Sequence, residues 1–354
     1  MGEHIRVLVL GTGQMGSGIA RLVLSKPGLE LVGVYARRTE RGGRDLGPLI
    51  GLERSVDISV SNDLPAVMAQ TKPRLAIQAT CSRLIDAHDE IVMLLQRGIH
   101  VISIAEEMAF PSCASPALAQ ELHRLALAQG VALLGTGINP GFVLDLLIIA
   151  LSGVCADIES IRAERVNDLT GYGPTVLRAQ GVGLDPDEFV QEVEVGRVVG
   201  HFGFPESIAM IANALGWEVE RVEQTRRPII SRVRRTTPHV TVEPGQVAGC
   251  DHRAVAWRKG VPLITLIHPQ QVHPGLEGIA TGDRIEIKGT PDISLSGSPE
   301  IPGATATIAL AVNMIPRVLN ARPGLHSMAD LPVPAAMLGE TGLSMQDAAR
   351  SGTR

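Results

Sequence analysis

Aromatic side chains are scarce in this chain of 354 residues. Phe, Trp and Tyr make up 3% of it, whereas hydrophobic residues of all kinds make up 45%, so its cores must be aliphatic. The chain also lacks an excess of positive charge, because 32 Lys and Arg stand against 37 Asp and Glu, giving a net charge of −5. Nucleic-acid binding, which requires clustered basic residues, is therefore not expected.

Long apolar runs are missing too. The longest, residues 142–151, contains Asp145 and is shorter than the roughly 20 residues that span a bilayer, so no membrane segment is expected. The first strand begins near His4, which leaves no room for a secretory signal. The four cysteines form no Cys-x-x-Cys pair, and no histidines stand at metal-ligand spacing. We expect a cytoplasmic protein with free thiols and no metal site.

From residue 4 to about residue 136, short apolar runs alternate with helical stretches. Such runs are typical of parallel strands that are covered on both faces. The alternation predicts an α/β fold, a doubly wound parallel sheet of the Rossmann type. The expected strands are Ile5–Leu10, Leu29–Tyr35, Asp57–Val60, Leu75–Thr80, His100–Ala105 and Val131–Gly135. The expected helices lie near Met15–Ser25, Leu64–Thr71, Leu84–Arg97 and Pro116–Gln129.

The alternation of short apolar runs with helical stretches ends after Gly137. A helix predicted at Phe142–Leu151 is followed by stretches with the period-two alternation of strands, among them Trp217–Val222, and by two further helices. This pattern predicts an α+β substrate domain. We expect a dinucleotide-binding domain at 1–137, the substrate domain at 138–302, a helix and tail at 303–337 that pack back on the first domain, and a polar, disordered tail at 338–354.

The first strand runs directly into Gly11-Thr12-Gly13-Gln14-Met15-Gly16 and then into a helix. In this strand–turn–helix context the GxGxxG pattern predicts a dinucleotide site. Gly11 allows the tight turn, Gly13 lets a pyrophosphate approach the backbone N–H groups, and Gly16 allows close contact between helix and strand. The alternative is a glycine-rich turn that binds no ligand. Glycine loses more conformational entropy on folding than other residues, so a turn without a ligand would have no reason to contain three glycines.

The end of the second strand bears on the choice between NAD and NADP. NAD sites usually place Asp or Glu there, roughly 20 residues beyond the glycines, to accept a hydrogen bond from the ribose. This chain has Arg37 and Arg38 and no carboxylate. Arginine binds a 2′-phosphate bidentately, so NADP is favoured, while use of NAD and a merely solvated arginine pair remain alternatives. Thr80 and Cys81, at the end of the fourth strand, are expected to flank the nicotinamide.

The end of the fifth strand carries Glu106 and Glu107. Neighbouring residues of an extended segment point in opposite directions, so only one can face a substrate. Glu106 is slightly favoured, and the alternative for both is a structural carboxylate that caps the following helix. A carbonyl reductase needs Lys, Tyr or His to protonate the developing oxyanion. A carboxylate instead stabilises an iminium ion and can take a proton from an ammonium group, which predicts chemistry at a carbon–nitrogen bond.

The loop after the sixth strand leads into the predicted helix at residue 142. Asn139 is a candidate contact to the nicotinamide amide or the substrate, and Phe142 and Leu146 are candidates for an apolar wall. Tyr172 and His201 are further pocket candidates. Ordinary turn chemistry or core packing is the alternative for each of these residues.

Five segments carry a family resemblance: GTGQMG (11–16), HVISIAEEMAFP (100–111), GTGINPGFVLDLL (135–147), GHFGFPESIAMIANALGW (200–217) and RVLNARPGLHSMADLPVP (317–334). The chain resembles 2,4-diaminopentanoate dehydrogenases and native amine dehydrogenases over nearly its whole length, to about residue 337. The resemblance implies a Rossmann domain, a dihydrodipicolinate-reductase-like second domain that also serves homodimerisation, and reversible NAD(P)H-dependent reductive amination. It also implies a catalytic glutamate at the Glu106–Glu107 pair.

The substrate remains open among small amines or ketones that react with ammonia. A diamino acid needs an anchor for its carboxylate, such as Arg165 or Arg178, whereas the apolar candidates Phe142, Leu144 and Leu146 favour a simple ketone and alkyl amine. A carbonyl or C=C reductase is an alternative, although homoserine dehydrogenases place lysine where Glu106 aligns. The Lys-x-Asp-Ala-Pro-Ser-Gly stretch of dihydrodipicolinate reductases is also missing. A non-catalytic NADP-binding protein is the third possibility.

Overall fold

The structure, a computed structural model, describes residues 4–338. The chain divides into two compact units. The first combines residues 1–142 with residues 303–354, and the second is the continuous segment 143–302. The first unit is therefore assembled from two stretches that are far apart in the sequence.

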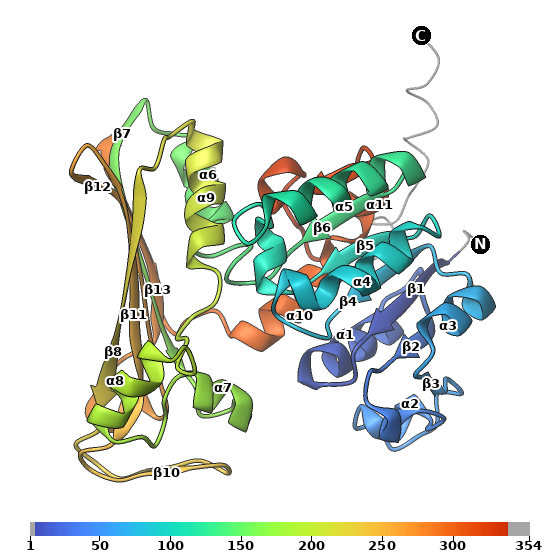
Figure 1. Cartoon of the computed structure of the whole chain (residues 1–354), viewed down its shortest axis with the longest axis horizontal. Coiled ribbons are helices and arrows are strands. Elements are labelled where there is room, and N and C mark those ends of the chain that lie inside the picture. The colour runs from blue at the N-terminus through green and yellow to red at the C-terminus, as the bar shows by residue number, and fades with distance from the viewer. Residues whose placement is uncertain (1–3, 339–354) are drawn as a thin grey trace. The chain divides into compact units, whose positions relative to one another are not determined.

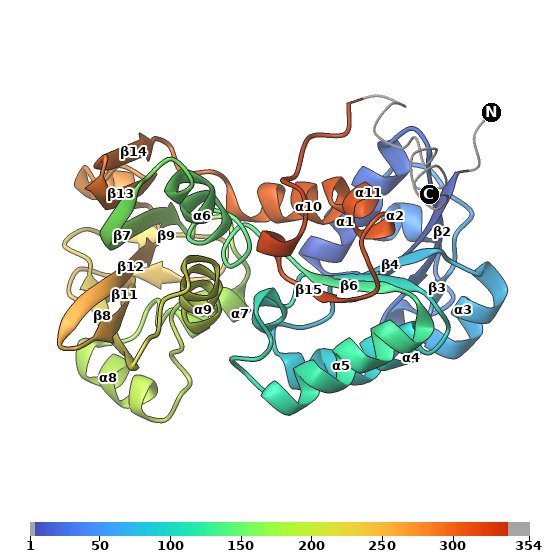
Figure 2. The same ribbon diagram turned by 90° about the horizontal axis from the view of Figure 1, so that it is seen from above.

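The first unit is a seven-stranded parallel sheet between two layers of helices (Figures 1 and 2). Its strand order is β15-β6-β5-β4-β1-β2-β3, and every neighbouring pair is parallel. The chain thus winds outward in both directions from β1, and ligands of such sheets bind where the order reverses. The strands are β1 (Ile5–Leu10), β2 (Leu29–Tyr35), β3 (Val60–Ser61), β4 (Leu75–Gln78), β5 (His100–Ser103), β6 (Ala132–Gly135) and β15 (Gly324–His326). This confirms the predicted Rossmann-type α/β fold.

Helices cover both faces of this sheet. Figure 2 shows α1, α10 and α11 over one face and α3, α4 and α5 over the other. A Cβ atom on Gly18 of α1 would lie 2.2 Å from Cδ1 of Ile308, so the glycine lets α10 pack directly on α1. The helices are α1 (Gln14–Ser25), α2 (Leu46–Leu49), α3 (Leu64–Thr71), α4 (Leu84–Leu95), α5 (Pro116–Gln129), α10 (Gly303–Asn313) and α11 (Ile315–Leu319), with short 3₁₀ turns η1 (Thr39–Arg41), η2 (Glu106–Ala109) and η4 (Met328–Asp330).

The core of the first unit is aliphatic, as the scarcity of aromatic residues requires. Leu8 and Leu10 of β1, Ile91 of α4, Val101 of β5 and Leu133 of β6 are all fully buried in one cluster. Burying each such side chain contributes about 1.5–3 kcal/mol of hydrophobic stabilisation. This packing holds the carboxyl ends of β1, β4 and β5 along one edge of the sheet.

The second unit is a six-stranded sheet with helices against one face (Figure 1). Its order is β14-β13-β7-β12-β11-β8, in which β12 and β7 are parallel and the other pairs antiparallel. The sheet strands are β7 (Asp157–Asp168), β8 (Arg221–Ile230), β11 (Val247–Arg258), β12 (Val261–Gln271), β13 (Gly282–Thr290) and β14 (Ile293–Gly297). The other elements are a ribbon of β9 (Arg235–Thr236) and β10 (Thr241–Val242), helices α6 (Leu146–Ser152), α7 (Pro174–Ala179), α8 (Pro186–Glu194) and α9 (Phe204–Leu215), and η3 (Pro274–Glu277).

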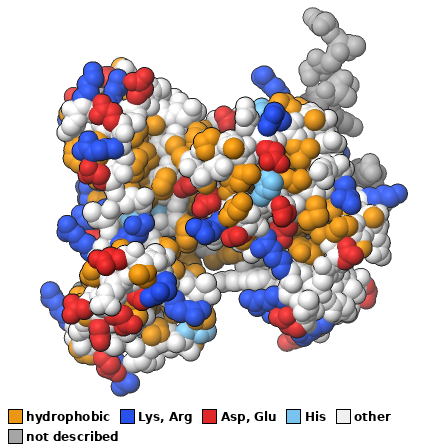
Figure 3. Space-filling view, viewed as in Figure 1, with side chains coloured by type: hydrophobic (Ala, Val, Ile, Leu, Met, Phe, Trp, Pro, Cys, Tyr) orange, Lys and Arg blue, Asp and Glu red, His pale blue; other side chains and the backbone are white. Residues whose placement is uncertain are grey.

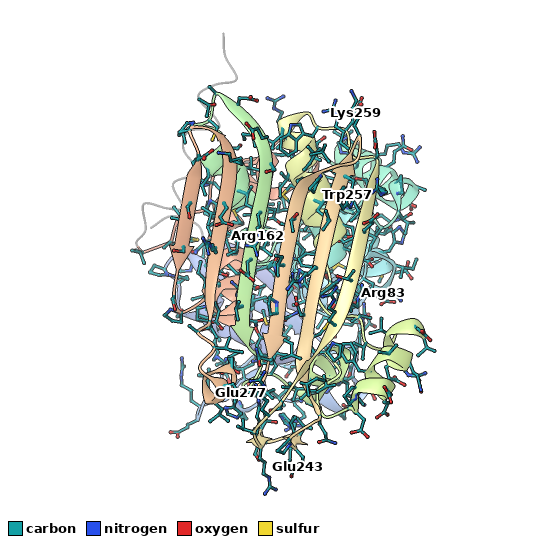
Figure 4. All side chains as sticks on the ribbon, turned by 90° about the vertical axis from the view of Figure 1, so that its left-hand side faces the viewer. Arg83, Arg162, Glu243, Trp257, Lys259 and Glu277 are labelled. Atoms are coloured by element: carbon teal, nitrogen blue, oxygen red, sulfur yellow. The ribbon has the colours of Figure 1, made fainter. Side chains whose placement is uncertain are left out.

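The two faces of this second sheet differ. Along β7, Ile161, Ala163 and Arg165 are buried, whereas Arg162 and Glu164 between them are partly exposed. Figure 4 looks onto the exposed face, with Arg162 and Trp257 labelled and the helices of the unit behind the sheet. The inner face, which lies against α6 and α9, is where side chains can be enclosed.

Several predicted element bounds are wrong. The third strand was expected at 57–60 but lies at Val60–Ser61, because Asp57 adopts a φ of 57°. The helix predicted from Phe142 begins only at Leu146, where the Asp145 carboxylate accepts a hydrogen bond from the Leu146 N–H at 2.6 Å. The strand predicted at 217–222 is also displaced, since β8 starts at Arg221. Apart from Leu338, the predicted tail at 338–354 lies outside the described residues.

Charged side chains of both signs are mixed on the surfaces seen in Figure 3, in keeping with the mild net charge of −5. Within residues 4–338, no helix combines the length and apolarity needed to cross a membrane. The same residues contain no group of three His, Cys, Asp or Glu placed to hold a metal ion.

Candidate functional site

The glycine turn after β1 has the form that a dinucleotide requires. Gly11 has a φ of +117°, and a Cβ there would lie 2.5 Å from the Ala79 carbonyl oxygen. A Cβ on Gly16 would lie 2.1 Å from the Gly11 oxygen, so both glycines are demanded by the protein itself. A Cβ on Gly13 would meet nothing within 4 Å. The chain therefore gives no internal reason for glycine at that exposed position, whereas close approach of a pyrophosphate does.

The N-terminus of α1 is open to an anion. Gly13 is its N-cap, no side chain caps it, and its first turn has no acidic residue. Thr12 and Gln14 flank the cap, and Met15 is partly buried. The unpaired N–H groups and the positive end of the helix dipole favour a phosphate there. The predicted turn residues thus fit a dinucleotide.

The two arginines after β2 differ in their surroundings. Arg37 Nε lies 2.7 Å from Glu90 Oε1, and its Nη2 donates to the Asp86 carbonyl oxygen at 2.6 Å. The Arg38 side chain is exposed and makes no hydrogen bond or ion pair within residues 4–338. Only Arg38 therefore has its whole guanidinium group available to a ligand.

The residues after β4 are held by the carboxylate of Glu90, which also pairs with Arg37. Thr80 Oγ1 donates to Glu90 Oε2 at 2.5 Å, and Gln78 Nε2 donates to Thr80 Oγ1 at 2.7 Å. Burial raises the pKa of the Cys81 thiol, which keeps it protonated near neutral pH. Thr80 and Cys81 lie at the carboxyl edge of the sheet, and contact with a nicotinamide stays a prediction. The buried Glu90 was not identified from sequence, although a carboxylate on the apolar face of a predicted helix is a usable signal.

The paired glutamates have different partners. Glu107 Oε2 accepts a hydrogen bond from the Leu84 N–H at 2.7 Å, so it satisfies a free donor at the start of α4. Glu106 is partly buried, and burial raises its pKa to about 7. Hydrogen bonds from the backbone and from Ser82 lower that pKa, and the nearby charge of Glu107 raises it further. Glu107 thus caps a helix, but this is the preceding α4 and not the following helix that was expected, while Glu106 has the pKa of a base that works near neutrality.

A glycine of β6 makes the position of Glu106 possible. The η2 turn passes so close to β6 that a Cβ on Gly135 would lie 1.7 Å from the Met108 carbonyl oxygen. Ser103 Oγ also accepts a hydrogen bond from the Ala105 N–H at 3.2 Å. The backbone is therefore held in place both before and after Glu106.

The loop after β6 is held by a glycine in the left-handed region and by a hydrogen bond to α10. Gly141 has a φ of +124°, and the Ile138 N–H donates to Thr307 Oγ1 at 3.1 Å. Asn139 and Phe142 are partly buried in the first unit. Leu146 is 5% exposed at the start of α6 in the second unit. Their predicted roles as a nicotinamide contact and an apolar wall remain predictions.

The inner face of the second sheet carries a cluster of polar side chains around His201. Its ring lies 4.7 Å from that of His268 and 4.9 Å from that of Phe204, measured between centroids. His268 Nε2 lies 3.1 Å from Asn167 Oδ1. Tyr172 shares a side-chain hydrogen bond with Asn167, and burial raises its pKa. Two of the predicted pocket residues, Tyr172 and His201, thus belong to one cluster.

This inner-face cluster is neutral and incompletely hydrogen-bonded. Burial lowers the pKa values of His201 and His268 well below the ordinary range and that of His252 to about 3. His201 Nε2 and Gln270 Nε2 are both buried and have no hydrogen-bond partner within the described chain. Because unpaired buried polar atoms are destabilising, these two point to a ligand or water. The sequence did not lead us to predict His268, Gln270 and Asn167 as pocket residues. The period-two spacing of His268 and Gln270 on β12, with Asn167 on the neighbouring β7, is a signal that could have placed them on one face.

The predicted anchors for a substrate carboxylate, Arg165 and Arg178, do not have guanidinium groups that are both buried and unpaired within the described residues. Arg165 is 2% exposed and pairs with Asp283 at 2.5 Å, and its Nη2 donates to the Ile301 oxygen at 2.5 Å. Arg178 lies exposed on α7. Arg165 still lowers the pKa values of His201 and His268 through its charge, so it contributes a positive potential to the inner-face cluster.

Comparisons with known proteins agree over nearly the whole chain. The family profile described as the 2,4-diaminopentanoate dehydrogenase C-terminal domain matches residues 142–347, and that of the dihydrodipicolinate reductase N-terminus matches residues 5–103. The chain is 42% identical to a 2,4-diaminopentanoate dehydrogenase of Acetoanaerobium sticklandii, with 96% of each chain covered. It is 26% identical to an amine dehydrogenase of Streptomyces virginiae, covering 94% of this chain and 98% of that one.

Solved structures extend the likeness to the fold. An amine dehydrogenase from Mycobacterium smegmatis superposes with a TM-score of 0.83 at 30% identity, covering 94% of this chain and 97% of that one. A dihydrodipicolinate reductase from Paenisporosarcina gives a TM-score of 0.54 at 14% identity, with coverage of 92% and 99%. The second comparison shows a shared fold alone, and it confirms the predicted architecture.

Proposed function

Because the chain belongs to the 2,4-diaminopentanoate dehydrogenase family, we propose that it catalyses the reversible, NADP-dependent oxidative deamination of a small primary amine, with Glu106 as the base. The observation that carries this proposal is the partly buried Glu106 carboxyl group after β5, whose pKa burial raises to about 7. A carboxyl with that pKa exchanges protons readily near neutral pH. Glu107 accepts a hydrogen bond from the start of α4, so we assign the role of base to Glu106.

The charge of Glu106 suits each proton step of deamination. As a carboxylate it takes a proton from the substrate ammonium group and frees the nitrogen lone pair. A dinucleotide held by the glycine turn would supply the hydride acceptor, and loss of hydride from the neighbouring carbon would leave an iminium cation. Once its proton has passed to solvent, Glu106 again carries the negative charge that stabilises this cation. It then takes a proton from the water that adds to the iminium carbon, and a carbinolamine forms. Return of this proton to the nitrogen, with loss of the hydroxyl proton, breaks the carbon–nitrogen bond and gives a ketone and ammonia.

The proposed cofactor is NADP. The exposed guanidinium group of Arg38, which has no partner within the described residues, supports binding of a 2′-phosphate. The glycine turn and the uncapped start of α1 support the pyrophosphate. Since these features of the turn serve NAD equally well, NAD remains a second substrate of the same site.

We further propose that the amine carries a second polar group, as 2,4-diaminopentanoate does. The sequence favoured an apolar pocket, but the inner face of the second sheet presents His201, His268 and Gln270. Two buried nitrogen atoms there, His201 Nε2 and Gln270 Nε2, lack hydrogen-bond partners within residues 4–338. An alkyl amine would leave both unsatisfied, whereas a carboxylate can accept a hydrogen bond from Gln270 Nε2 and from His201 Nε2 in the tautomer that carries the proton there. The positive charge of Arg165 beneath this inner-face cluster favours the carboxylate.

The active form is proposed to be a homodimer that uses the exposed face of the second sheet. That face alternates charges within one patch, where Arg162 pairs with Glu164 and Glu286 at 3.6 and 3.5 Å. A two-fold contact places equivalent residues of both copies in one interface, so mixed charges can pair across it. The apolar Val255 and part of Trp257 lie among them.

The first test concerns the base. We expect Glu106→Gln to lower the rate of ammonium-dependent NADPH oxidation with a small ketone at least about 100-fold, because it removes the proton acceptor. Glu107→Gln is the matched control, since its amide oxygen can still accept from the Leu84 N–H, and it should retain activity. Equal loss in both variants, or equal turnover without ammonium, would contradict the proposal.

The second test concerns the substrate. Steady-state NADP⁺ reduction should show a kcat/KM at least about tenfold higher for 2,4-diaminopentanoate than for 2-aminopentane, which has the same carbon chain and no carboxylate. Asn167→Leu, of similar size, should reduce this preference while leaving 2-aminopentane oxidation nearly unchanged. A preference for the alkyl amine would refute the polar assignment and leave amine dehydrogenation intact.

The third test concerns the dimer. Arg284 of β13 lies in the same patch and pairs with Glu286 at 2.6 Å. Sedimentation equilibrium should give twice the chain mass for the wild type, and the Arg162→Glu/Arg284→Glu double variant should shift toward the monomer because like charges then face each other. Arg97→Glu on the first unit is the control and should leave the mass unchanged. A wild-type monomer at micromolar concentration would rule the dimer out.

A further inference from the structure

Glu90 is a carboxylate that the proposed reaction does not use. It lies on the buried side of α4, between the fully buried Ala87 and Ile91, and is itself 5% exposed. A buried carboxylate is costly unless it is paired and hydrogen-bonded. Glu90 meets that requirement with one cation and two neutral donors, all from the carboxyl edge of the sheet.

The neutral donors form a chain that points toward Glu90. Ser103 Oγ donates to Gln78 Oε1 at 2.6 Å, and Gln78 Nε2 donates to Thr80 Oγ1 at 2.7 Å. Thr80 Oγ1 then donates to Glu90 Oε2 at 2.5 Å. Hydrogen bonds aligned in one direction strengthen one another, so the carboxylate is held firmly in place. Its other oxygen, Oε1, is left for Arg37.

This placement occupies one edge of the Arg37 guanidinium group. Nε is paired with Glu90 at 2.7 Å, and Nη2 donates to the Asp86 carbonyl oxygen at 2.6 Å. A guanidinium group binds phosphate bidentately through such an edge. Glu90 also neutralises the charge of Arg37 at close range, whereas Arg38, the next residue, has neither restraint.

We propose that Glu90 is a positioning residue that withholds Arg37 from the 2′-phosphate, so that Arg38 alone determines the preference for NADP over NAD. This inference rests on the proposed cofactor. It assigns opposite roles to two adjacent arginines of the same type: Arg38 discriminates between the dinucleotides, and Arg37 serves both equally. Removing Glu90 should therefore release a second phosphate-binding arginine.

The experiment measures binding by calorimetry, independently of turnover. The readout is the discrimination ratio, the Kd for NADH divided by the Kd for NADPH, of the full chain and its variants. Arg38→Gln should lower the ratio at least about tenfold, the scale of one charge-assisted phosphate contact. Arg37→Gln/Glu90→Gln removes the ion pair without leaving a buried charge and should change the ratio less than about threefold. Arg97→Gln, at the far end of α4, is the control for loss of one positive charge.

The decisive variants release Arg37 by removing its acceptor, since a glutamine oxygen at position 90 could still accept from Arg37 Nε. Glu90→Leu should raise the ratio at least about threefold, and Glu90→Leu/Arg38→Gln should exceed Arg38→Gln by a similar factor, because the freed guanidinium replaces the lost one. The inference is overturned if Arg37→Gln/Glu90→Gln lowers the ratio as far as Arg38→Gln does. It is equally overturned if Glu90→Leu weakens the binding of both nucleotides alike, which is the result expected of a purely structural role. A wild type that binds neither nucleotide would refute the cofactor itself.

Discussion

Desolvation of a single carboxyl group, that of Glu106, is the interaction on which the proposed chemistry depends. The parallel sheet brings the end of β5 to the edge where ligands of this fold bind. Gly135 lets the η2 turn pass directly over β6, and Glu107 ties the turn to α4. With its neighbour and its backbone thus fixed, Glu106 stays partly enclosed, and burial raises its pKa to about 7.

Carboxylates in the first unit have different roles because their partners differ. Glu107 meets a backbone N–H, Glu90 meets a guanidinium group, and Glu106 meets one hydroxyl group, that of Ser82. Of the three, Glu106 alone lacks a cation or a helix start to stabilise its charge, and burial raises its pKa. In the second unit the buried histidines of the inner-face cluster carry no charge, and their hydrogen-bonding capacity is what they offer a substrate.

Much of the first unit could be predicted from the sequence because its signals are local. The glycine turn, the strand ends and the alternation of strands with helices all lie within short windows. The partners of those residues could not be predicted. Nothing in the sequence pairs Arg37 with Glu90, which is 53 residues away, or separates the adjacent Glu106 and Glu107 by function. In the second unit the inner-face cluster draws on β7, β11 and β12 and the start of α9, so it depends on sheet register.

The measurement that tests the central claim most directly is the pH dependence of kcat/KM for amine oxidation between pH 5 and pH 9. Because the folded-state pKa of Glu106 is raised to about 7, the carboxylate that acts as base is scarce at pH 5 and abundant at pH 9. The account predicts a rise of about tenfold per pH unit that levels off near pH 7 and is absent in Glu106→Gln. A wild-type profile with no ionisation near pH 7, or the same limb in Glu106→Gln, would contradict it.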